Sequence, residues 1–305
     1  MTSHRELNPH RPISESSVLL AGPVRNVAGV IEREVQTLMA SLIHFKSIDC
    51  LVVESDSNDD TVKKLAELTK TIPQFSYVSM GQLSQHYPRR TDRIALCRNV
   101  IIDAVAQNPA YAHIDYIAMA DMDGMNSLIT PEKITQCWKV SEPWDVITAN
   151  QLGPYYDTWA LKHPDWNPTD CWQQRTALEN IIGYEAAENL AITAKQVALD
   201  PSAGLIEVDS AFGGFAIYRR EAFLAGRYVG SVSEGRLDEI CEHISYHAEL
   251  RQKGYRIYIN CALINCEHQV VSKRAEMILK WIQALGLLVF GKKRLNKYLD
   301  LIKAR

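Results

Sequence analysis

The sequence predicts an α/β fold, with a Rossmann-like, mostly parallel sheet flanked by helices and a helical segment at the C-terminus. Three observations favour this fold. Short apolar segments of strand length alternate with segments of helical periodicity between residues 17 and 150. Polar side chains directly follow three of the apolar segments. Hydrophobic residues make up 47% of the 305 residues, which is enough for a full core.

The order of the elements follows from these patterns. In the first half we expect strands over 17–21, 48–53, 75–80, 114–120 and 145–150, and helices over 27–45, 62–69, 90–106 and 131–140. The first strand should end at Gly22-Pro23. In the second half we expect helices over 176–198 and 238–252 and a strand over 255–259. The pair Gly213-Gly214, in a strand context, indicates close approach of a ligand or of another backbone segment.

Two carboxylates close the apolar run 114–120, which is typical of a strand buried on both faces. Asp121 and Asp123 lie one residue apart at its carboxyl end, where open α/β sheets bind ligands. In an extended segment their side chains point the same way, so they repel unless a cation lies between them. Oxygen ligands of this kind suit Mg²⁺ or Mn²⁺, either of which can bridge to a diphosphate. Gly124 lets a ligand approach the backbone.

Polar residues also follow the first two expected strands, namely Arg25 and Asn26 after the first and residues 54–57 after the second. Right-handed crossovers place all three strand ends along one edge of the sheet, which gives a site of nucleotide size. The sequence contains neither Gly-x-Gly-x-x-Gly nor a P-loop motif. Phosphates would therefore be held by a metal and by Arg or Lys side chains.

The composition excludes several classes of protein. A net charge of −3 disfavours a general nucleic-acid-binding protein. The seven cysteines include no Cys-x-x-Cys pair, which indicates reduced thiols in a cytoplasmic protein rather than a disulfide scaffold or a zinc site. No apolar run reaches the roughly 18 residues of a membrane-spanning helix, and no signal peptide is visible.

The segment 151–174 is rich in large aromatic residues: Tyr155, Tyr156, Trp159, Trp166 and Trp172. Exposed rings of this kind stack on sugars. The alternative is that they pack a loop onto the core, and the sequence leaves both interpretations open.

With these residues in view, the chain resembles metal-dependent glycosyltransferases of the GT-A fold. The resemblance covers residues 18–268 and rests on four motifs in order: Val-Arg-Asn at 24–26, the acidic and serine-rich 53–61, Asp-Met-Asp at 121–123, and Phe-Gly-Gly-Phe at 212–215 with Cys-Glu-His at 241–243. The acidic, serine-rich second motif and the Cys-Glu-His helix most resemble the fungal capsule-type α-1,3-mannosyltransferases and their bacterial capsule relatives.

The resemblance implies a role for each candidate residue. Glu54 or Asp56 would bind the ribose and base of a nucleotide-sugar donor, and Arg98 or Arg93 would neutralise its diphosphate, next to Arg25. Asp121 would contact the donor sugar or ribose at the reaction centre. Asp121, Asp123 and His268 would ligate Mn²⁺ or Mg²⁺, and Glu242 would act on the acceptor. At His243 many relatives carry a second acid, so the identity of a general base stays open, as does the choice between retention and inversion.

The expected function is transfer of a hexose, mannose being one candidate, from a GDP- or UDP-sugar to a glycan or lipid-linked acceptor in surface polysaccharide synthesis. The alternatives are a nucleotidyltransferase that makes the nucleotide sugar and a non-catalytic sugar-binding relative. A nucleotidyltransferase usually has a Gly-rich basic loop after the first strand, where this chain has Gly22-Pro23-Val24-Arg25-Asn26.

We expect a flexible lead over 1–16, a catalytic domain over 17–271 and a tail over 272–305. The catalytic domain would divide into a nucleotide-binding half, 17–126, and an acceptor half, 127–271. The tail is basic at both ends and apolar between, which is typical of a helix that lies on an anionic membrane. It would hold the enzyme peripherally on the inner face of the membrane. The alternative is a terminal helical pair packed on the catalytic domain or on a partner.

Overall fold

The computed structural model describes residues 9–231 and 239–268. The chain divides into two units, residues 1–268 and 269–305. The predicted C-terminal helical tail, 272–305, lies outside the described residues, as do residues 1–8 of the predicted lead.

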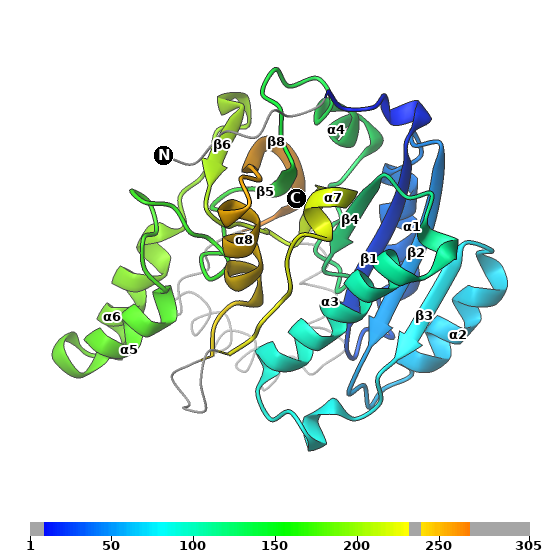
Figure 1. Cartoon of the computed structure of the whole chain (residues 1–305). Helices are drawn as coiled ribbons and strands as arrows, with labels where there is room; N and C mark the ends of the chain where they lie inside the picture. Colours follow the sequence, from blue (N-terminus) through cyan, green and yellow to red (C-terminus); the bar gives the residue numbers. More distant parts are fainter. Residues whose placement is uncertain (1–8, 232–238, 269–305) are drawn as a thin grey trace, which may run out of the picture. The chain divides into compact units, whose positions relative to one another are not determined.

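Strands and helices alternate along the first half of the chain (Figure 1). Its elements are β1 (Ser17–Val24), α1 (Ile31–Ser41), β2 (Ser47–Glu54), α2 (Thr61–Thr71), β3 (Phe75–Ser79), α3 (Arg90–Gln107), β4 (Tyr116–Ala120), α4 (Pro131–Gln136) and β5 (Val146–Leu152). The second half contains α5 (Cys171–Ile182), α6 (Tyr184–Ala191), β6 (Leu205–Val208), β7 (Phe215–Arg219), α7 (Arg220–Phe223), α8 (Glu242–Gln252) and β8 (Ile257–Glu267). Short 3-10 turns lie at Ile13–Glu15, Leu83–Gln85, Pro109–Tyr111, Thr193–Lys195 and Pro201–Ala203.

The strands form one eight-stranded sheet in the order β3-β2-β1-β4-β7-β5-β8-β6. Neighbours β3, β2, β1 and β4 are all parallel, and so are β5 and β8. Strand β7 runs antiparallel between β4 and β5, and β6 is antiparallel to β8. The predicted mostly parallel, Rossmann-like sheet flanked by helices is therefore confirmed.

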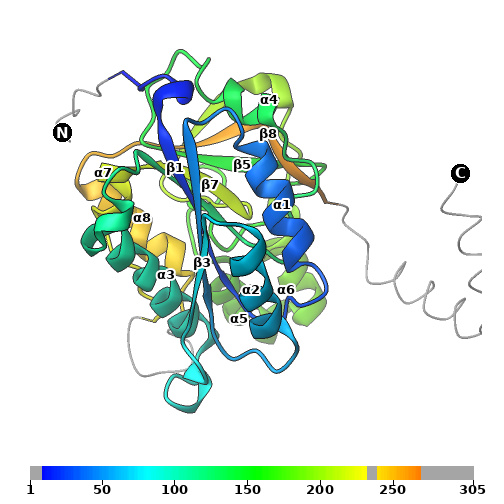
Figure 2. The ribbon, with the colours of Figure 1, turned by 90° about the vertical axis from the view of Figure 1, so that its right-hand side faces the viewer.

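Two apolar cores lie on opposite faces of the sheet, because successive strand side chains point to alternate faces. Along β1, Leu19 and Ala21 face one core, which includes α3 and α8. Val18 and Leu20 face the other core, to which α1, α2 and α4 contribute. Figure 2 shows these two layers of helices on either side of the sheet.

Part of the predicted lead contacts the sheet. His10 packs on Trp144 with 4.1 Å between ring centroids, and the Trp138 indole nitrogen donates a hydrogen bond to the carbonyl of Arg11. Trp144 lies directly before β5, so residues 10 and 11 lie at the amino-terminal edge of the parallel strands.

The structure tests two sequence expectations about glycines. Strand β1 does not end at Gly22-Pro23 but continues to Val24. A Cβ atom on Gly22 would lie 2.1 Å from the carbonyl oxygen of Ala120, so glycine allows the ends of β1 and β4 to lie close together. Gly213 and Gly214 precede β7 instead of lying within it, with positive φ angles of 68° and 84°. The expected close approach of another backbone segment is confirmed, because a Cβ atom on Gly213 would lie 2.7 Å from the carbonyl oxygen of Ala149.

The helix expected over 176–198 is two helices, α5 and α6, which pack against each other beyond the edge of the sheet (Figure 1). Asp170 caps α5 by accepting hydrogen bonds from the amides of Trp172 and Gln173, so the helix begins earlier than expected. Gly183, with a φ of 83°, ends it.

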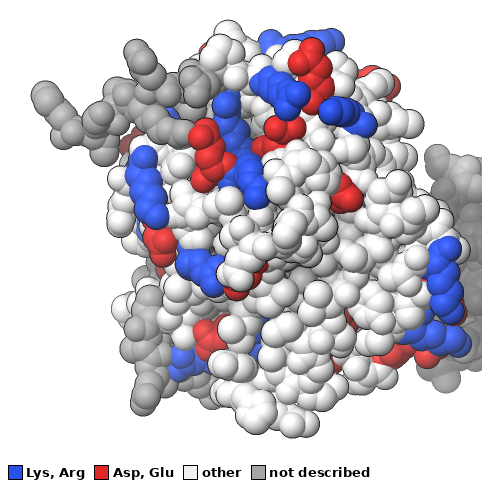
Figure 3. Space-filling model, turned by 45° about the vertical axis from the view of Figure 1, so that its right-hand side comes forward, with Lys and Arg blue, Asp and Glu red and all other residues white. Residues whose placement is uncertain are grey.

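Strand β8 runs on to Glu267, beyond the expected end at residue 259, because it pairs with β6 and then with the end of β5. All seven cysteines are free and buried. No helix in the part of the chain that the structure describes is long and apolar enough to cross a membrane. On the face shown in Figure 3, the described acidic and basic side chains are interspersed.

Candidate active site

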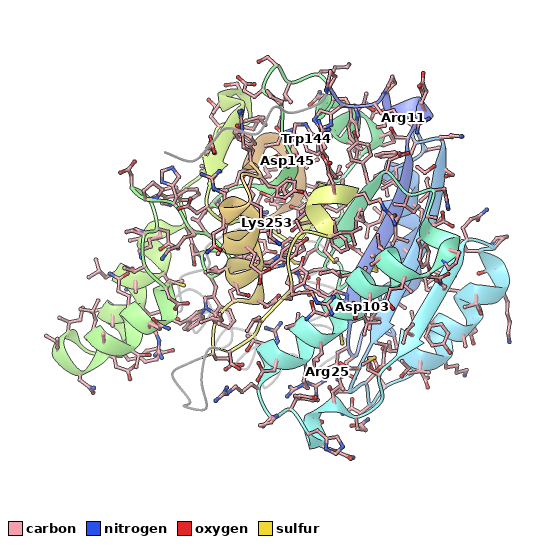
Figure 4. The ribbon with its side chains drawn as sticks, in the orientation of Figure 1. Arg11, Arg25, Asp103, Trp144, Asp145 and Lys253 are labelled. Atoms are coloured by element: carbon pink, nitrogen blue, oxygen red, sulfur yellow. The ribbon has the colours of Figure 1, made fainter. Side chains whose placement is uncertain are left out.

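A cleft of about 520 Å³ opens where β1, β2 and β4 end. Its volume is within the roughly 300–1,000 Å³ typical of ligand sites. Figure 4 shows Arg25 at this edge of the sheet, opposite the edge that carries Arg11, Trp144 and Asp145. Seven predicted site residues line the cleft: Arg25, Asp56, Arg93, Arg98, Asp121, Asp123 and Glu242. Two predicted site residues, Glu54 and His268, do not.

The guanidinium of Arg98 lies between two of the predicted carboxylates. Its Nη2 is 3.1 Å from Asp121 Oδ1, and its Nε is 3.6 Å from Glu242 Oε1. The Arg98 side chain is only 4% exposed, and the Glu242 side chain 7%. Arg98 is therefore already paired with the protein's own carboxylates. The structure joins the end of β4 to the start of α8 through this one cation.

The environment of Asp121 favours its neutral form. Loss of hydration raises the pKa of Asp121 to about 7. The charge of Arg98 opposes this shift of the pKa, whereas the charges of Asp123, Asp157 and Glu242 add to it. Negative charge thus exceeds positive charge around this carboxyl group, which still exposes 36% of its side chain.

We expect Arg98→Met to unfold more easily, because it leaves Glu242 and Asp121 without their shared countercharge. Removing one partner of a buried ion pair costs about 3–5 kcal/mol, and the partial exposure of Asp121 places the expected loss near the lower value. Urea denaturation at pH 7 measures it. A change below about 1 kcal/mol, the range of surface pairs, would show that the cluster is effectively solvated.

The loop after β2 holds Asp56 at the cleft. Asp56 has a φ of 59°, a conformation that Asp tolerates better than most residues. Its Oδ1 accepts a hydrogen bond of 2.7 Å from the Ser84 amide, and its Oδ2 lies 3.4 Å from Arg93 Nε. Burial opposes ionisation of Asp56, but these contacts lower its pKa on balance. Glu54 instead accepts hydrogen bonds from the Ser57 amide and the Ser79 hydroxyl, and these bonds hold the loop after β2 in place.

Two arginines in the cleft wall form no ion pair within the described residues. Arg25 follows β1, and its Nε donates one hydrogen bond to the carbonyl of Asp56. Arg90 begins α3. Arg25 and Arg90 are both exposed. Arg93 and Arg98, by contrast, each have a carboxylate partner. Of the described residues in the cleft wall, Arg25 and Arg90 are therefore the cations available for an anionic ligand.

We expect Arg25→Gln and Arg90→Gln each to weaken binding of GDP or UDP by about tenfold. This is the effect of losing one hydrogen bond of roughly 1.5 kcal/mol to a charged group. Titration calorimetry in the presence of Mn²⁺ measures it, and Arg227→Gln, an exposed arginine outside the cleft, is the control. Unchanged affinity in both cleft variants would exclude these two residues as phosphate ligands.

A buried amide supports the loop that carries Asp121 and Asp123. The Asn126 side-chain nitrogen donates to the carbonyl of Asp121 at 2.7 Å and to Glu34 Oε1 at 2.8 Å. The Asn126 side-chain oxygen accepts a hydrogen bond from Asn265 on β8. Helix α1 and strand β8 thus fix the backbone of this loop through Asn126, while the Asp123 side chain itself is exposed.

The two carboxylates at the end of β4 fit a hard divalent cation. They offer oxygen ligands, and the excess of negative charge around Asp121 is what such an ion would neutralise. No group of three His, Cys, Asp or Glu residues within 9–231 and 239–268 could hold a metal alone. His268 directly follows β8, and its ring lies 5.4 Å from that of Tyr156, a residue of the cleft wall. Its role as a third ligand stays a prediction.

Several cleft residues were missed by the sequence analysis. Arg90 and Asp157 line the cleft but follow no motif and no strand end. Asp157 accepts a hydrogen bond of 2.9 Å from the Gly213 amide, so the glycine pair indirectly shapes the cleft. Of the aromatic residues in 151–174, Tyr156 and Trp159 line the cleft. Tyr155, Trp166 and Trp172 do not. Tyr155 is fully buried and Trp166 packs against the core, so packing accounts for these two, whereas stacking of Tyr156 and Trp159 on a sugar stays a prediction.

No protein-family model matches the chain, and no curated protein matches it. Among solved structures, it is similar to a mannosyltransferase from Pyrobaculum calidifontis in complex with GDP-Man and Mn²⁺, with 15% identity, a TM-score of 0.47 and coverage of 93% of this chain. It is also similar to glucosyl-3-phosphoglycerate synthase from Mycobacterium tuberculosis in complex with UDP, with 13% identity, a TM-score of 0.40 and 91% coverage. A third similar structure is TarS 1-349 of S. aureus, with 11% identity, a TM-score of 0.38 and 80% coverage.

The chain spans 66%, 81% and 57% of the lengths of these three chains, respectively. At such identities and TM-scores the similarities establish no family for this protein. The function proposed below therefore rests on the residues of the cleft.

Proposed function

We propose that the chain is a metal-dependent glycosyltransferase of the GT-A type. It transfers a hexosyl group from a GDP- or UDP-sugar to a glycan or lipid-linked acceptor in surface polysaccharide synthesis. One observation carries the proposal: a single cleft contains a carboxylate pair suited to a divalent cation, two arginines that form no ion pair with the described residues, and a carboxylate for the acceptor side, Glu242.

The donor side of the reaction needs charge stabilisation, because a nucleoside diphosphate leaves with negative charge on its phosphates. Asp123 and Asp121 would hold Mn²⁺ or Mg²⁺, which supplies electrostatic stabilisation of that leaving group. Arg25 and Arg90 add positive charge in the wall of the same cleft. Asp56, fixed beside Arg93, suits the hydroxyls of a ribose, because its carboxylate stays ionised and accepts hydrogen bonds.

The acceptor side centres on Glu242, which starts α8. Its Oε1 faces Arg98, its Oε2 has no hydrogen-bond partner among the described residues, and the residue lines the cleft. In an inverting reaction Oε2 would take the proton of the acceptor hydroxyl, and in a retaining reaction it would orient that hydroxyl. Tyr156 and Trp159 offer aromatic surface for a sugar ring in the same cleft.

A panel of nucleotide sugars, each with and without Mn²⁺, tests the donor half of this proposal. We expect one GDP- or UDP-sugar to raise the melting temperature and to be slowly hydrolysed, in both cases only with the metal. Equal stabilisation with and without Mn²⁺ would contradict a metal-dependent donor site. Pyrophosphate-dependent formation of a nucleoside triphosphate would instead identify a nucleotidyltransferase.

The predicted tail gives a separate expectation about membranes. We expect a chain that ends at Val271 to stay folded and active on soluble acceptors, but no longer to sediment with anionic liposomes. Binding of the full chain should weaken with added salt, because salt screens the basic residues of 272–305. If the full chain ignores anionic liposomes at low salt, or the shortened chain unfolds, the tail packs on the protein instead.

A further inference from the structure

The guanidinium of Arg98 meets a different protein partner at each of its three nitrogens. Nη2 faces Asp121, Nε faces Glu242, and Nη1 contacts the imidazole of His243. We propose that His243 is a positioning residue, which orients Arg98 so that one cation serves the donor-side and the acceptor-side carboxylates together.

The contact assigns a protonation state to His243. All guanidinium nitrogens are donors, so the imidazole nitrogen that faces Arg98 must accept the hydrogen bond, which a doubly protonated ring cannot do. The surroundings agree, because burial and then the charge of Arg98 hold the pKa of His243 well below its usual range. His243 is 2% exposed, so its nitrogen cannot turn to water instead.

Aromatic packing fixes both rings of this contact. The imidazole of His243 stacks on Phe212 with 4.0 Å between centroids and 22° between planes. The guanidinium carbon of Arg98 lies 4.7 Å from the centroid of the same phenyl ring. The ring of Tyr228 lies nearly perpendicular to the imidazole, with 5.6 Å between centroids. Phe212 therefore positions both the hydrogen-bond donor, Arg98, and the hydrogen-bond acceptor, His243.

A neutral partner at this position has an electrostatic consequence. Two carboxylates share one guanidinium, so the cluster of Asp121, Arg98 and Glu242 carries one net negative charge when both acids are ionised. A third acid in place of His243 would compete for Arg98 and draw it away from the other two. The neutral imidazole orients the cation without taking part of its charge, which leaves Glu242 Oε2 available for the acceptor.

The kinetic test rests on the proposed function and uses matched substitutions. His243→Phe keeps the ring shape but removes the acceptor, and we expect kcat to fall about 100-fold, as displacement of a reacting group by about 1 Å does. The calorimetric Kd for GDP or UDP with Mn²⁺ should change far less than kcat, because Asp123, Arg25 and Arg90 stay in place and form no described contact with His243. His243→Gln places an amide oxygen near the position of Nε2 and should restore most of the lost rate.

The control is His247→Phe, the same substitution one turn further along α8. His247 is also fully buried, but its nitrogens contact the hydroxyls of Ser210 and Tyr218 instead of Arg98. We expect it to lower the melting temperature without lowering kcat of the folded protein. If His247→Phe lowers kcat as much as His243→Phe, or His243→Gln rescues nothing, His243 is only a packing residue.

Nitrogen-15 NMR of the full chain tests the geometry without any activity. We expect the His243 signals of a neutral tautomer from pH 6 to pH 8, and separate Nη1 and Nη2 signals for Arg98 because its rotation is restricted. In His243→Phe the two Nη signals should merge. Imidazolium shifts at His243 at pH 7, or Arg98 signals that the substitution leaves unchanged, would overturn the inference. This outcome does not depend on whether the proposed function is correct.

Discussion

Replacing Asp123 with alanine is expected to abolish turnover and Mn²⁺-dependent nucleotide binding while the protein stays folded. The Asp123 side chain is exposed and makes no hydrogen bond or ion pair with the described residues, so its loss should cost little stability. The backbone of its loop is held independently by Asn126. Mutation of a residue that only hydrogen-bonds to a metal ligand commonly lowers metal affinity about 10–100-fold. Removal of the ligand itself should therefore lower it by at least about 100-fold.

Isothermal titration of GDP and UDP with and without Mn²⁺ measures the loss, and circular dichroism checks the fold. Asp165→Ala is the control, because Asp165 is an exposed aspartate outside the cleft. A folded Asp123→Ala protein that still binds nucleotide more tightly with Mn²⁺ would show that the metal is held elsewhere.

The second large effect is expected at Glu242. Glu242→Gln preserves the size of the side chain but removes the charge that, in the proposed function, would face the acceptor. General-base catalysis contributes roughly 10²–10⁴-fold, so we expect an inverting transfer to slow by that factor, while donor binding changes little. The comparison is between the transfer rate and the calorimetric Kd for the donor nucleotide with Mn²⁺.

Glu249→Gln on the same helix is the control, since Glu249 lies outside the cleft wall. Near-normal transfer by Glu242→Gln would make Glu242 a structural partner of Arg98 only, and the acceptor would then have to be placed elsewhere. A small loss in a proven retaining reaction would instead fit the orienting role.

Local patterns sufficed for most of the fold. The apolar run that became β4 is buried at every position, and the strand and helix order up to β5 follows from periodicity alone. Strand β8 was predicted too short because its second half pairs with the end of β5, a contact that no local pattern encodes. The break between α5 and α6 had a local signal, Gly183, which the helical periodicity around it outweighed.

The strand-end rule identified one side of the candidate site. It found Arg25, Asp56, Asp121 and Asp123, which all line the cleft. The surroundings of Arg98 were not predictable in the same way, because its partners Glu242 and His243 come from α8 in the other half of the chain. Sequence order cannot tell an arginine that faces phosphate from one that is already paired.

The most direct test of the central claim is transfer of a labelled sugar. Purified full-length protein is incubated with Mn²⁺, the nucleotide sugar that binds in the panel, and a mixture of glycan and lipid-linked acceptors. We predict that label appears in an acceptor, that one nucleoside diphosphate is released for each sugar transferred, and that chelation of the metal stops both. The account would be contradicted if the donor binds but no labelled sugar is transferred to any acceptor, even with excess Mn²⁺. That result would favour a non-catalytic sugar-binding protein.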